Sequence, residues 1–309
     1  MTEEELKERE RQLLERERRL AEVEKNVHRQ ELTFDTNNYV VMANNMLTHS
    51  ASNLTLDELK LLRFIIMQTK KGDKELYEFE LSAKDFAALL EVNIKTKDLY
   101  KRLDTMTTHL MQEVIKIGDD SKKKWVKFHW VDVCRYDNGK ITIKISDELK
   151  PFLVDLRGKF TRYQLSEIIS FKSAYAIRLY EIINGYMNEN NLPHADVAIE
   201  ISISVEELRK NTDTVNKFER PYDFKRKVVD IAVKEINQKS KYHVTATPYK
   251  NGKSYAGFDF IIESQAGYYH RTAAGQQGKK ENQLDGQMNI LDYQQGDNEF
   301  YISAAGRII

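Results

Sequence analysis

Residues 217–241, KFERPYDFKRKVVDIAVKEINQKSK, contain the pattern that decides the fold. Apolar residues recur there at helical spacing and predict one buried face, formed by Phe224, Val228, Ile231, Ala232 and Ile236. The segment that follows, 242–262, alternates as two strands around Asn251-Gly252, which is a strong hairpin signal. A basic amphipathic helix followed by a hairpin predicts a winged helix, in which the helix enters a DNA groove and the hairpin lies beside the phosphates.

An earlier part of the chain has the same order of elements. We expect helices at 54–71, 83–90 and 96–113 and strands at 78–81, 124–136 and 140–146. In the second unit we expect helices at 173–190 and 205–210 and a strand at 197–203, before the basic helix and its hairpin. Ser82-x-x-Asp85 and Ser204-x-x-Glu207 begin the short helices of the two units in the same way. This correspondence predicts an internal duplication of one structural plan.

The predicted fold class is therefore α+β, with two tandem winged-helix domains, a charged N-terminal helix and a disordered C-terminal tail. Pro151 and Gly158 interrupt the pattern between the two units, which places the boundary near 150–160. The predicted bounds are 1–35 for a charged helical extension, 36–155 for the first winged-helix domain, 156–263 for the second, and 264–309 for a polar, mostly disordered tail.

The two ends of the chain depart from the repeated plan. Residues 1–31 contain 18 Asp, Glu, Lys or Arg, and apolar residues recur every seven positions at Leu6, Leu13, Leu20 and Val27. The companion positions of this heptad are mostly charged, so a solvated single helix and a weak helix that pairs between chains both stay open. The tail has an apolar island at 287–293, which is either a partner-docking motif or a segment packed on its own domain.

Charge is distributed unevenly although the formal net charge is zero. Residues 95–127 contain nine Lys/Arg and five Asp/Glu, a net of +4, and residues 217–250 contain nine and four, a net of +5. The rest of the chain must then have a net of −9. A local basic surface steers a protein toward phosphate whatever the total charge. Each cluster is either a solvated surface or a DNA-binding surface, and their place on matching elements favours DNA.

The sequence shows no pattern of an enzyme or a metal site. Gly252-Lys253-Ser254 resembles the end of a phosphate-binding loop, but Thr247 stands where that loop needs a glycine, so we interpret it as a wing tip. No two of the seven histidines are two or four residues apart, as a metal-dependent nickase would need. The single cysteine, Cys134, permits no intrachain disulfide and is expected to be buried in a strand. We expect no catalytic residues, no metal and no cofactor.

Targeting and membrane signals are also missing from the sequence. No apolar run suits a signal peptide, and none approaches the length that spans a bilayer. We therefore expect a soluble cytoplasmic protein with no membrane partner.

Several motifs resemble one family, the iteron-binding plasmid replication initiators of the Rep_3 type. The residues that carry the resemblance are 160–165 (FTRYQL), 173–183 (SAYAIRLYEII), 222–225 (YDFK) and 234–237 (KEIN). Residues 40–62 resemble the start of the first winged helix of that family. The resemblance extends over residues 39–262, roughly three quarters of the chain, and leaves out the charged N-terminal segment and the polar tail.

The resemblance implies a protein that binds direct repeats in double-stranded DNA at a plasmid origin and helps to open the adjacent AT-rich DNA. It implies the host initiator and the replicative helicase as partners, self-association through the first domain, and repression of the protein's own promoter. No nuclease or ATPase activity is implied. A winged-helix transcriptional regulator without replication activity has the same DNA-binding features and is the alternative; a DNA-nicking initiator would be an enzyme.

The candidate DNA-binding residues are the basic side chains of the two helices, of the hairpins and of the adjoining segments. We expect Arg226 to contact a guanine edge and the lysines to contact phosphates. The predicted set is Lys95, Lys97, Lys101, Arg102, Lys122, Lys123, Lys124, Lys217, Arg220, Lys225, Arg226, Lys227, Lys234, Lys250 and Lys253. Arg178 lies within the family motif and is expected to form a structural ion pair rather than a DNA contact.

Overall fold

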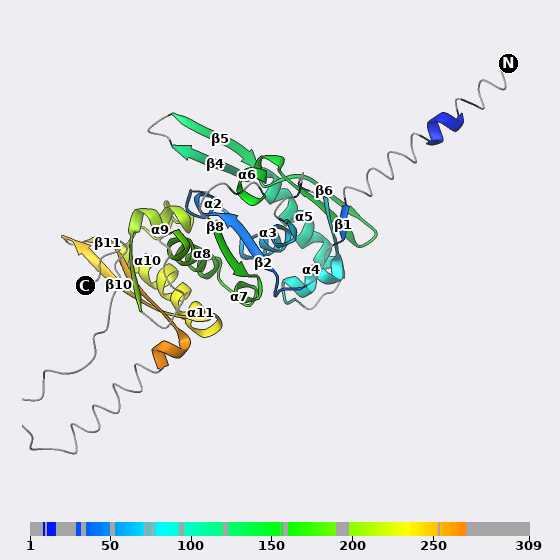
Figure 1. The fold of residues 1–309 in the computed structure, drawn as a ribbon. Helices are drawn as coiled ribbons and strands as arrows, with labels where there is room; N and C mark the ends of the chain where they lie inside the picture. Colours follow the sequence, from blue (N-terminus) through cyan, green and yellow to red (C-terminus); the bar gives the residue numbers. More distant parts are fainter. Residues whose placement is uncertain are drawn as a thin grey trace, which may run out of the picture.

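The computed structural model describes residues 9, 11–16, 29–31, 35–49, 53–70, 73, 76, 78–92, 96–119, 123–154, 156, 160–189, 198–252 and 254–269. Over these residues the chain forms two winged-helix units that lie side by side (Figure 1). This confirms the prediction of two winged-helix domains in an α+β protein.

The first unit has the helix and strand order that the sequence predicts. Its main elements are α3 (Leu56–Gln68), β3 (Glu78–Ser82), α4 (Ala83–Leu89), α5 (Thr96–Gln112), β6 (Val131–Asp137) and β7 (Lys140–Ile145). The sheet order is β1-β3-β7-β6, in which β1 (Arg29–Glu31) adds to β3 in parallel. The Thr55 hydroxyl accepts the N–H of Glu58, and the Glu58 carboxylate accepts the N–H of Thr55, which is the predicted capping box.

The second unit repeats this arrangement. Its elements are α8 (Ala174–Glu189), β9 (Ile199–Ser204), α9 (Val205–Asn211), α10 (Pro221–Phe224), α11 (Asp230–Lys239), β10 (Tyr242–Asn251) and β11 (Ser254–Ser264). The sheet order is β10-β11-β9, so each unit places its last strand between its first and second. The hairpins turn at Asn138, Gly139 and Gly252, whose φ angles are 46°, 82° and 64°. The angles of Asn138 and Gly139 are those that the predicted Asn-Gly turn requires. In the second hairpin Asn251 pairs with Ser254 as the last residue of β10, so the turn begins one residue later than the Asn251-Gly252 signal suggests.

An additional two-stranded ribbon differs from the predicted pattern. β4 (Val114–Asp119) and β5 (Lys124–His129) pair antiparallel and extend from the body of the first unit (Figure 1). The strand predicted at 124–136 is therefore two strands, β5 and β6, separated at the buried Trp130. The physical reason is that three of the four residues 114–117 (Val-Ile-Lys-Ile) are β-branched, which favours a strand and so provides a second partner for β5. The second unit has no such ribbon among its described residues.

The segment between the two units is structured, although it was expected to link them. A 3-10 turn (Asp147–Leu149) leads into α6 (Lys150–Leu153), and β8 (Phe160–Gln164) pairs antiparallel with β2 (Tyr39–Ala43). The short helices α2 (Asn44–His49) and α7 (Ser166–Ile169) follow these two strands. Thr161 and Tyr163 of β8 are fully buried, so the alternation of FTRYQ is that of a strand with one face in the core.

Helix α8 lies at the centre of the molecule, where it packs against α2 and α3 on one side and α11 on the other (Figure 1). Glu181 of α8 accepts hydrogen bonds from Arg63 of α3 at 2.5 and 3.0 Å and from the Tyr163 hydroxyl at 2.6 Å. Arg178 is buried as well, and burial together with the charge of Arg63 lowers its pKa to about 10. Its structural ion pair stays a prediction. Burial alone would raise the pKa of Glu181, yet the two guanidinium groups and the hydrogen bonds hold it below its ordinary value. A buried ion pair therefore joins α3 to α8.

The basic helix contains a wide turn that the sequence pattern does not predict. α10 continues through a π-helical turn (Lys225–Val229) into α11, and the N–H of Asp230 bonds to the carbonyl of Lys225. A π turn takes up about one residue more than an α turn, so the residues beyond it are displaced around the axis by about 100°.

This displacement changes the buried face of the helix. Four of the five residues predicted for this face are buried: Phe224, Val228, Ala232 and Ile236. Val229 is buried as well, and Ile231 is 42% exposed. The prediction that Ile231 faces the core was wrong, because it assumed 3.6 residues per turn throughout.

The two ends of the described chain also differ from expectation. Residues 11–16 are helical, but residues 29–31 form strand β1, so the predicted helical extension over 1–35 was wrong there. Residues 265–269 form a helical turn, and the Gln265 side chain donates to the carbonyl of Tyr242 at 2.7 Å. The predicted tail therefore begins with an ordered turn on the second unit, while the island at 287–293 lies outside the described residues.

Two further expectations have outcomes in the structure. Cys134 lies in strand β6 as expected but is half-buried, and burial raises the pKa of its thiol. Within the described part of the chain, every helix is too short or too polar to cross a lipid bilayer.

Candidate nucleic-acid interface

The start of the basic helix in the second unit presents a cluster of exposed cations. Arg226 is 59% exposed and lies 3.6 Å from Asp223, which is also 3.7 Å from Lys227. These distances are long for ion pairs, so both cations are available to an outside anion. Arg220, at the residue before the helix, is exposed as well.

Aromatic rings lie under these cations. The Arg226 guanidinium is 5.7 Å from the ring centre of Tyr222, and the Lys227 amine is 5.4 Å from that of Phe218. Tyr222 is itself 65% exposed. Such contacts orient a cation while leaving its donors free, so the aromatic residues hold the basic groups in place for a phosphate or a base edge.

The remaining lysines of this helix differ in availability. Lys225 is largely covered and bonds to Asp230 at 2.6 Å across the π turn. Lys234 is exposed on the outward side. At the hairpin, Lys250 is exposed, and its amine lies 5.9 Å from the ring centre of Tyr255. Lys225 is thus the least accessible of the predicted cations on this unit.

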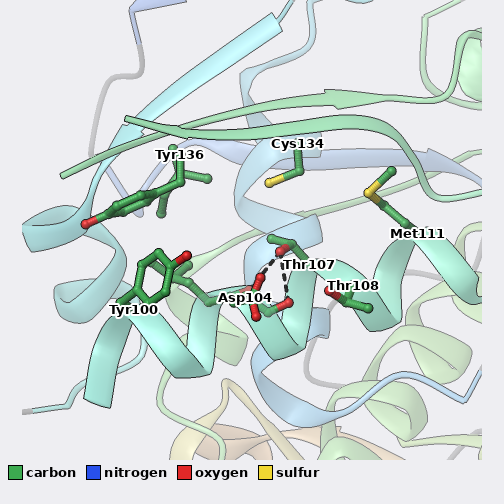
Figure 2. Close-up of a pocket in the computed structure, with 9 residues that line it drawn as sticks. Tyr100, Asp104, Thr107, Thr108, Met111, Cys134 and Tyr136 are labelled. Atoms are coloured by element: carbon green, nitrogen blue, oxygen red, sulfur yellow. Dashed lines mark hydrogen bonds between the residues drawn. The ribbon is translucent and has the colours of Figure 1, made fainter. Parts of the chain in front are cut away.

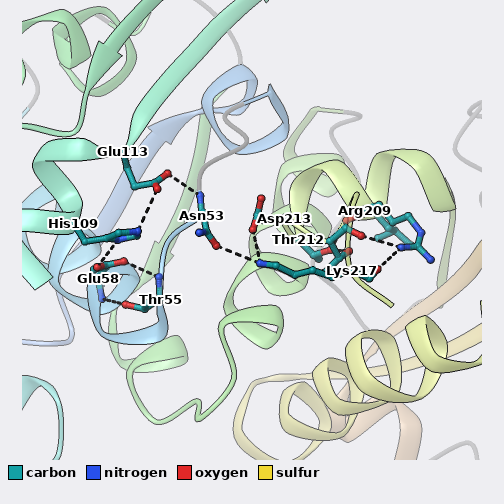
Figure 3. Close-up of polar contacts among 11 residues, drawn as sticks. Asn53, Thr55, Glu58, His109, Glu113, Arg209, Thr212, Asp213 and Lys217 are labelled. Atoms are coloured by element: carbon teal, nitrogen blue, oxygen red, sulfur yellow. Dashed lines mark hydrogen bonds and ion pairs between the residues drawn. The ribbon is translucent and has the colours of Figure 1, made fainter. Parts of the chain in front are cut away.

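Lys217 belongs to a polar network between the two units (Figure 3). Its amine lies 2.8 Å from Asp213 and 3.3 Å from the side-chain oxygen of Asn53 in the first unit. The Asn53 N–H donates to Glu113, and His109 lies between Glu113 and Glu58 at 3.2 and 2.8 Å. Lys217 would therefore have to give up its contacts with Asp213 and Asn53 to bind DNA as predicted.

Arg209 fixes the loop that precedes the basic helix (Figure 3). It donates to the backbone carbonyls of Thr214, Lys217 and Phe218 at 2.7–2.9 Å, and its guanidinium lies 4.4 Å from the Phe224 ring centre. Burial lowers its pKa. With its donors used in this way, Arg209 positions the helix start and is not offered to DNA.

On α5 of the first unit, one of the predicted cations is paired and another is exposed. Arg102 donates to Asp57 at 2.7 Å, while Lys101 is exposed on α5. The acidic residues Asp57 and Asp98 lie in the same shallow depression as these two cations. Three predicted residues, Lys95, Lys122 and Lys253, and the side chain of Lys97 lie outside the described residues.

The ribbon contains basic and aromatic residues that the sequence analysis did not select. Trp125 is 52% exposed, with the amines of Lys127 and Lys116 at 4.8 and 5.8 Å from its ring centre. Lys123 and Lys124 are exposed at the start of β5, where the ribbon turns. The β-branched residues of 114–117 (Val-Ile-Lys-Ile) were the signal that would have revealed this strand.

A separate cavity of about 200 Å³ lies between α5 and β6 (Figure 2). Tyr100, Met111 and Tyr136 surround it, and Cys134 lies at its floor. The Thr107 hydroxyl that faces it donates to the Leu103 carbonyl at 2.8 Å, so this polar group is satisfied within the helix. The described residues contain no group of three or more His, Cys, Asp or Glu suited to a metal ion.

Comparison with known proteins gives matches over both units. The family model described as "Initiator Replication protein, WH1" matches residues 40–184, and the model described as "Initiator Rep protein, WH2" matches residues 204–262. A curated "Replication initiation protein" of Escherichia coli is 25% identical over 166 residues, which cover 52% of this chain and 52% of that protein. The match thus spans about half the length of the curated relative.

A solved structure shows the same fold. The Pi initiator protein, in its complex with iteron DNA, superposes with a TM-score of 0.58 and 21% identity. The superposition covers 74% of this chain and 98% of that one. At this identity the likeness is one of fold, and it extends over both winged-helix units.

Proposed function

The chain belongs to the Rep3-type initiator replication proteins, and we propose that it initiates plasmid replication by binding direct repeats, or iterons, in double-stranded origin DNA. The observation that carries this proposal is the exposed cluster at the start of the basic helix, where Arg226 and Lys227 lie beside Tyr222 and Phe218. Helices α10 and α11 enter the major groove, and the β10–β11 hairpin with Lys250 lies beside the phosphates. Domain bounds of 36–155 and 156–263 belong to the proposal.

The first unit supplies a second, weaker contact through α5, where Lys101 is exposed. Two helices that each enter a major groove contact half-sites about one helical turn, or 10 base pairs, apart. The repeat is therefore about 20 base pairs long.

Binding to several repeats promotes opening of the adjacent DNA and recruits the host initiator and replicative helicase. The protein also associates with itself through the first domain and represses its own promoter. These steps extend the proposal beyond DNA binding, and they rest on the family to which the chain belongs.

A plasmid that has only this gene and its neighbouring direct repeats as an origin tests the proposal. We expect it to replicate, and we expect a double variant, Arg226→Ala with Lys227→Ala, to abolish replication. Lys210→Ala is the matched control, because Lys210 is exposed and pairs with Glu206 on α9, away from the basic helix. A protein that binds the repeats without supporting replication would instead be a transcriptional regulator.

A binding titration gives a second test. Neutralising several phosphates releases counterions, so the affinity for the repeat is expected to fall steeply as salt rises. A shallow salt dependence would contradict DNA binding through these cations.

A further inference from the structure

Ile231 is an apolar residue on the exposed side of the basic helix. It is 42% exposed, although Phe224, Ala232 and Ile236 of the same continuous helix are buried. At about 100° per residue, an uninterrupted α-helix would bring Ile231 to within about 20° of Phe224. Because the π turn takes up one residue, Ile231 lies about 120° away and Ala232 takes the inner place.

The outward side of the helix is shared by Ile231 and two of the candidate DNA contacts. On the same geometry Arg226 and Lys234 point within about 60° of Ile231, and both are exposed. The neighbouring carboxylate of Asp230 is held by Lys225 at 2.6 Å. The surface around Ile231 is therefore basic on either side with an apolar centre.

We propose that Ile231 contacts the 5-methyl group of a thymine in the major groove and so determines specificity for one T·A pair. Thymine presents a methyl group there, and apolar side chains make the matching contact, which neither arginine nor lysine supplies. Five residues at a rise of about 1.5 Å correspond to about two base-pair steps of 3.4 Å. The thymine thus lies about two base pairs from the base that Arg226 contacts.

This inference rests on the proposed function, and its test begins with the binding site itself. The full-length protein selects its preferred sequence from duplexes with a randomised region. Each thymine of the selected repeat is then replaced in turn by deoxyuridine, which removes the methyl group and leaves the hydrogen bonds intact. Wild-type protein is expected to lose about fourfold in affinity at one position, as the loss of one buried methyl group predicts.

The variants connect that loss to Ile231. Ile231→Ala is expected to bind the thymine and the deoxyuridine repeats equally at this position, while Ile231→Val retains part of the difference. Val215→Ala is the matched control, because Val215 is also an exposed β-branched residue but precedes the helix. This control is expected to keep the full wild-type loss.

Two outcomes overturn the inference while repeat binding stands. In one, no deoxyuridine substitution weakens binding; in the other, Ile231→Ala shows the wild-type loss at the same position. A wild-type protein that selects no sequence at all overturns the proposed function and this inference with it.

Discussion

Arg226 and Lys227 are adjacent, approach the same carboxylate of Asp223, and are expected to act differently on DNA. The flat guanidinium bonds to two acceptors of a guanine, whereas the lysine amine meets a phosphate as a point charge. Arg226→Ala should therefore cost about 1–3 kcal/mol and relax one base preference. Lys227→Ala should weaken all sequences alike and lower the salt slope by about one. Fluorescence anisotropy titrations at several salt concentrations measure both; equal behaviour of the two variants would contradict the assignment.

Arg63 and Glu181 form an ion pair that is almost fully excluded from water. Removing one partner leaves an uncompensated charge in the core, so Arg63→Met is expected to lower the free energy of unfolding by about 3–5 kcal/mol. The control is Arg102→Met, whose pair with Asp57 is exposed and should cost at most about 1 kcal/mol. Urea unfolding of the two variants measures the two losses of unfolding free energy. Similar losses would show that the buried pair stabilises the fold no more than the exposed one.

The same pair predicts how stability depends on pH. Since the folded-state pKa of Glu181 lies below its ordinary value, its contribution to stability is present above the unfolded pKa of about 4.3 and is lost as the pH falls through the folded pKa. Unfolding free energies from pH 7 down to pH 3 should therefore decline. In Arg63→Met the decline should be smaller or reversed, because burial without the guanidinium raises the pKa. If Arg63→Met showed the wild-type dependence of unfolding free energy on pH, Glu181 would not be the source of that dependence.

At the scale of elements, the sequence predicts those whose signals are local. The Thr55–Glu58 box and the Asn138-Gly139 turn place α3 and the β6–β7 hairpin because caps and turns depend on a few adjacent residues. The π turn was not predictable in this way, since the apolar residues around Val229 also fit a regular helix. The ribbon was missed because a short β-branched stretch such as 114–117 does not reveal which strand it pairs with. In the sequence β5 follows β4 and precedes β6, so either could have been its partner.

In the candidate site, too, features set by nearby residues were predictable and features set by distant contacts were not. Exposed cations on the basic helix, such as Arg226 and Lys234, were predictable from helical spacing. The hydrogen bond from Lys217 to Asn53 could not be predicted, since it joins residues far apart in the chain. The sequence pattern placed Ile231 on the buried face, which was wrong because a π turn precedes it in the helix.

Gly118 is the residue on which the shape of the ribbon depends. Its φ is +144°, and a Cβ there would lie 2.3 Å from the Lys124 carbonyl oxygen and 2.5 Å from the Cα of Trp125. Gly118→Ala is expected to disrupt the ribbon at a cost of about 1–3 kcal/mol. Trypsin cleavage at Lys123 and Lys124 should accelerate, while the fluorescence of the buried Trp130 in a Trp125→Phe background should stay unchanged. Unaltered cleavage would show that the ribbon accommodates the side chain.

At the scale of the whole molecule, buried contacts through α8 hold the two winged helices in one arrangement. The two DNA-contacting helices are then fixed relative to each other, and the spacing of the half-sites should be fixed as well. Inserting five base pairs between the half-sites rotates one by about half a turn. We expect the affinity to fall to that of a single half-site, measured by competition with a half-site duplex. Full affinity for the extended repeat would show that the units move independently.

The position of α8 also determines where such a protein can exchange a winged-helix unit by recombination. Arg63 and Glu181 are 118 residues apart, and Tyr163 completes their cluster from a third segment. A recombination event that joined this first unit to a foreign second unit within residues 150–160 would separate Arg63 from its own Tyr163 and Glu181. A crossover after Glu189 keeps all three residues together and transfers a new DNA specificity with α10 and α11. Chimeras that survive selection should therefore be joined behind α8, so that this helix is inherited together with α3 and β8, the segments against which its ion pair is built.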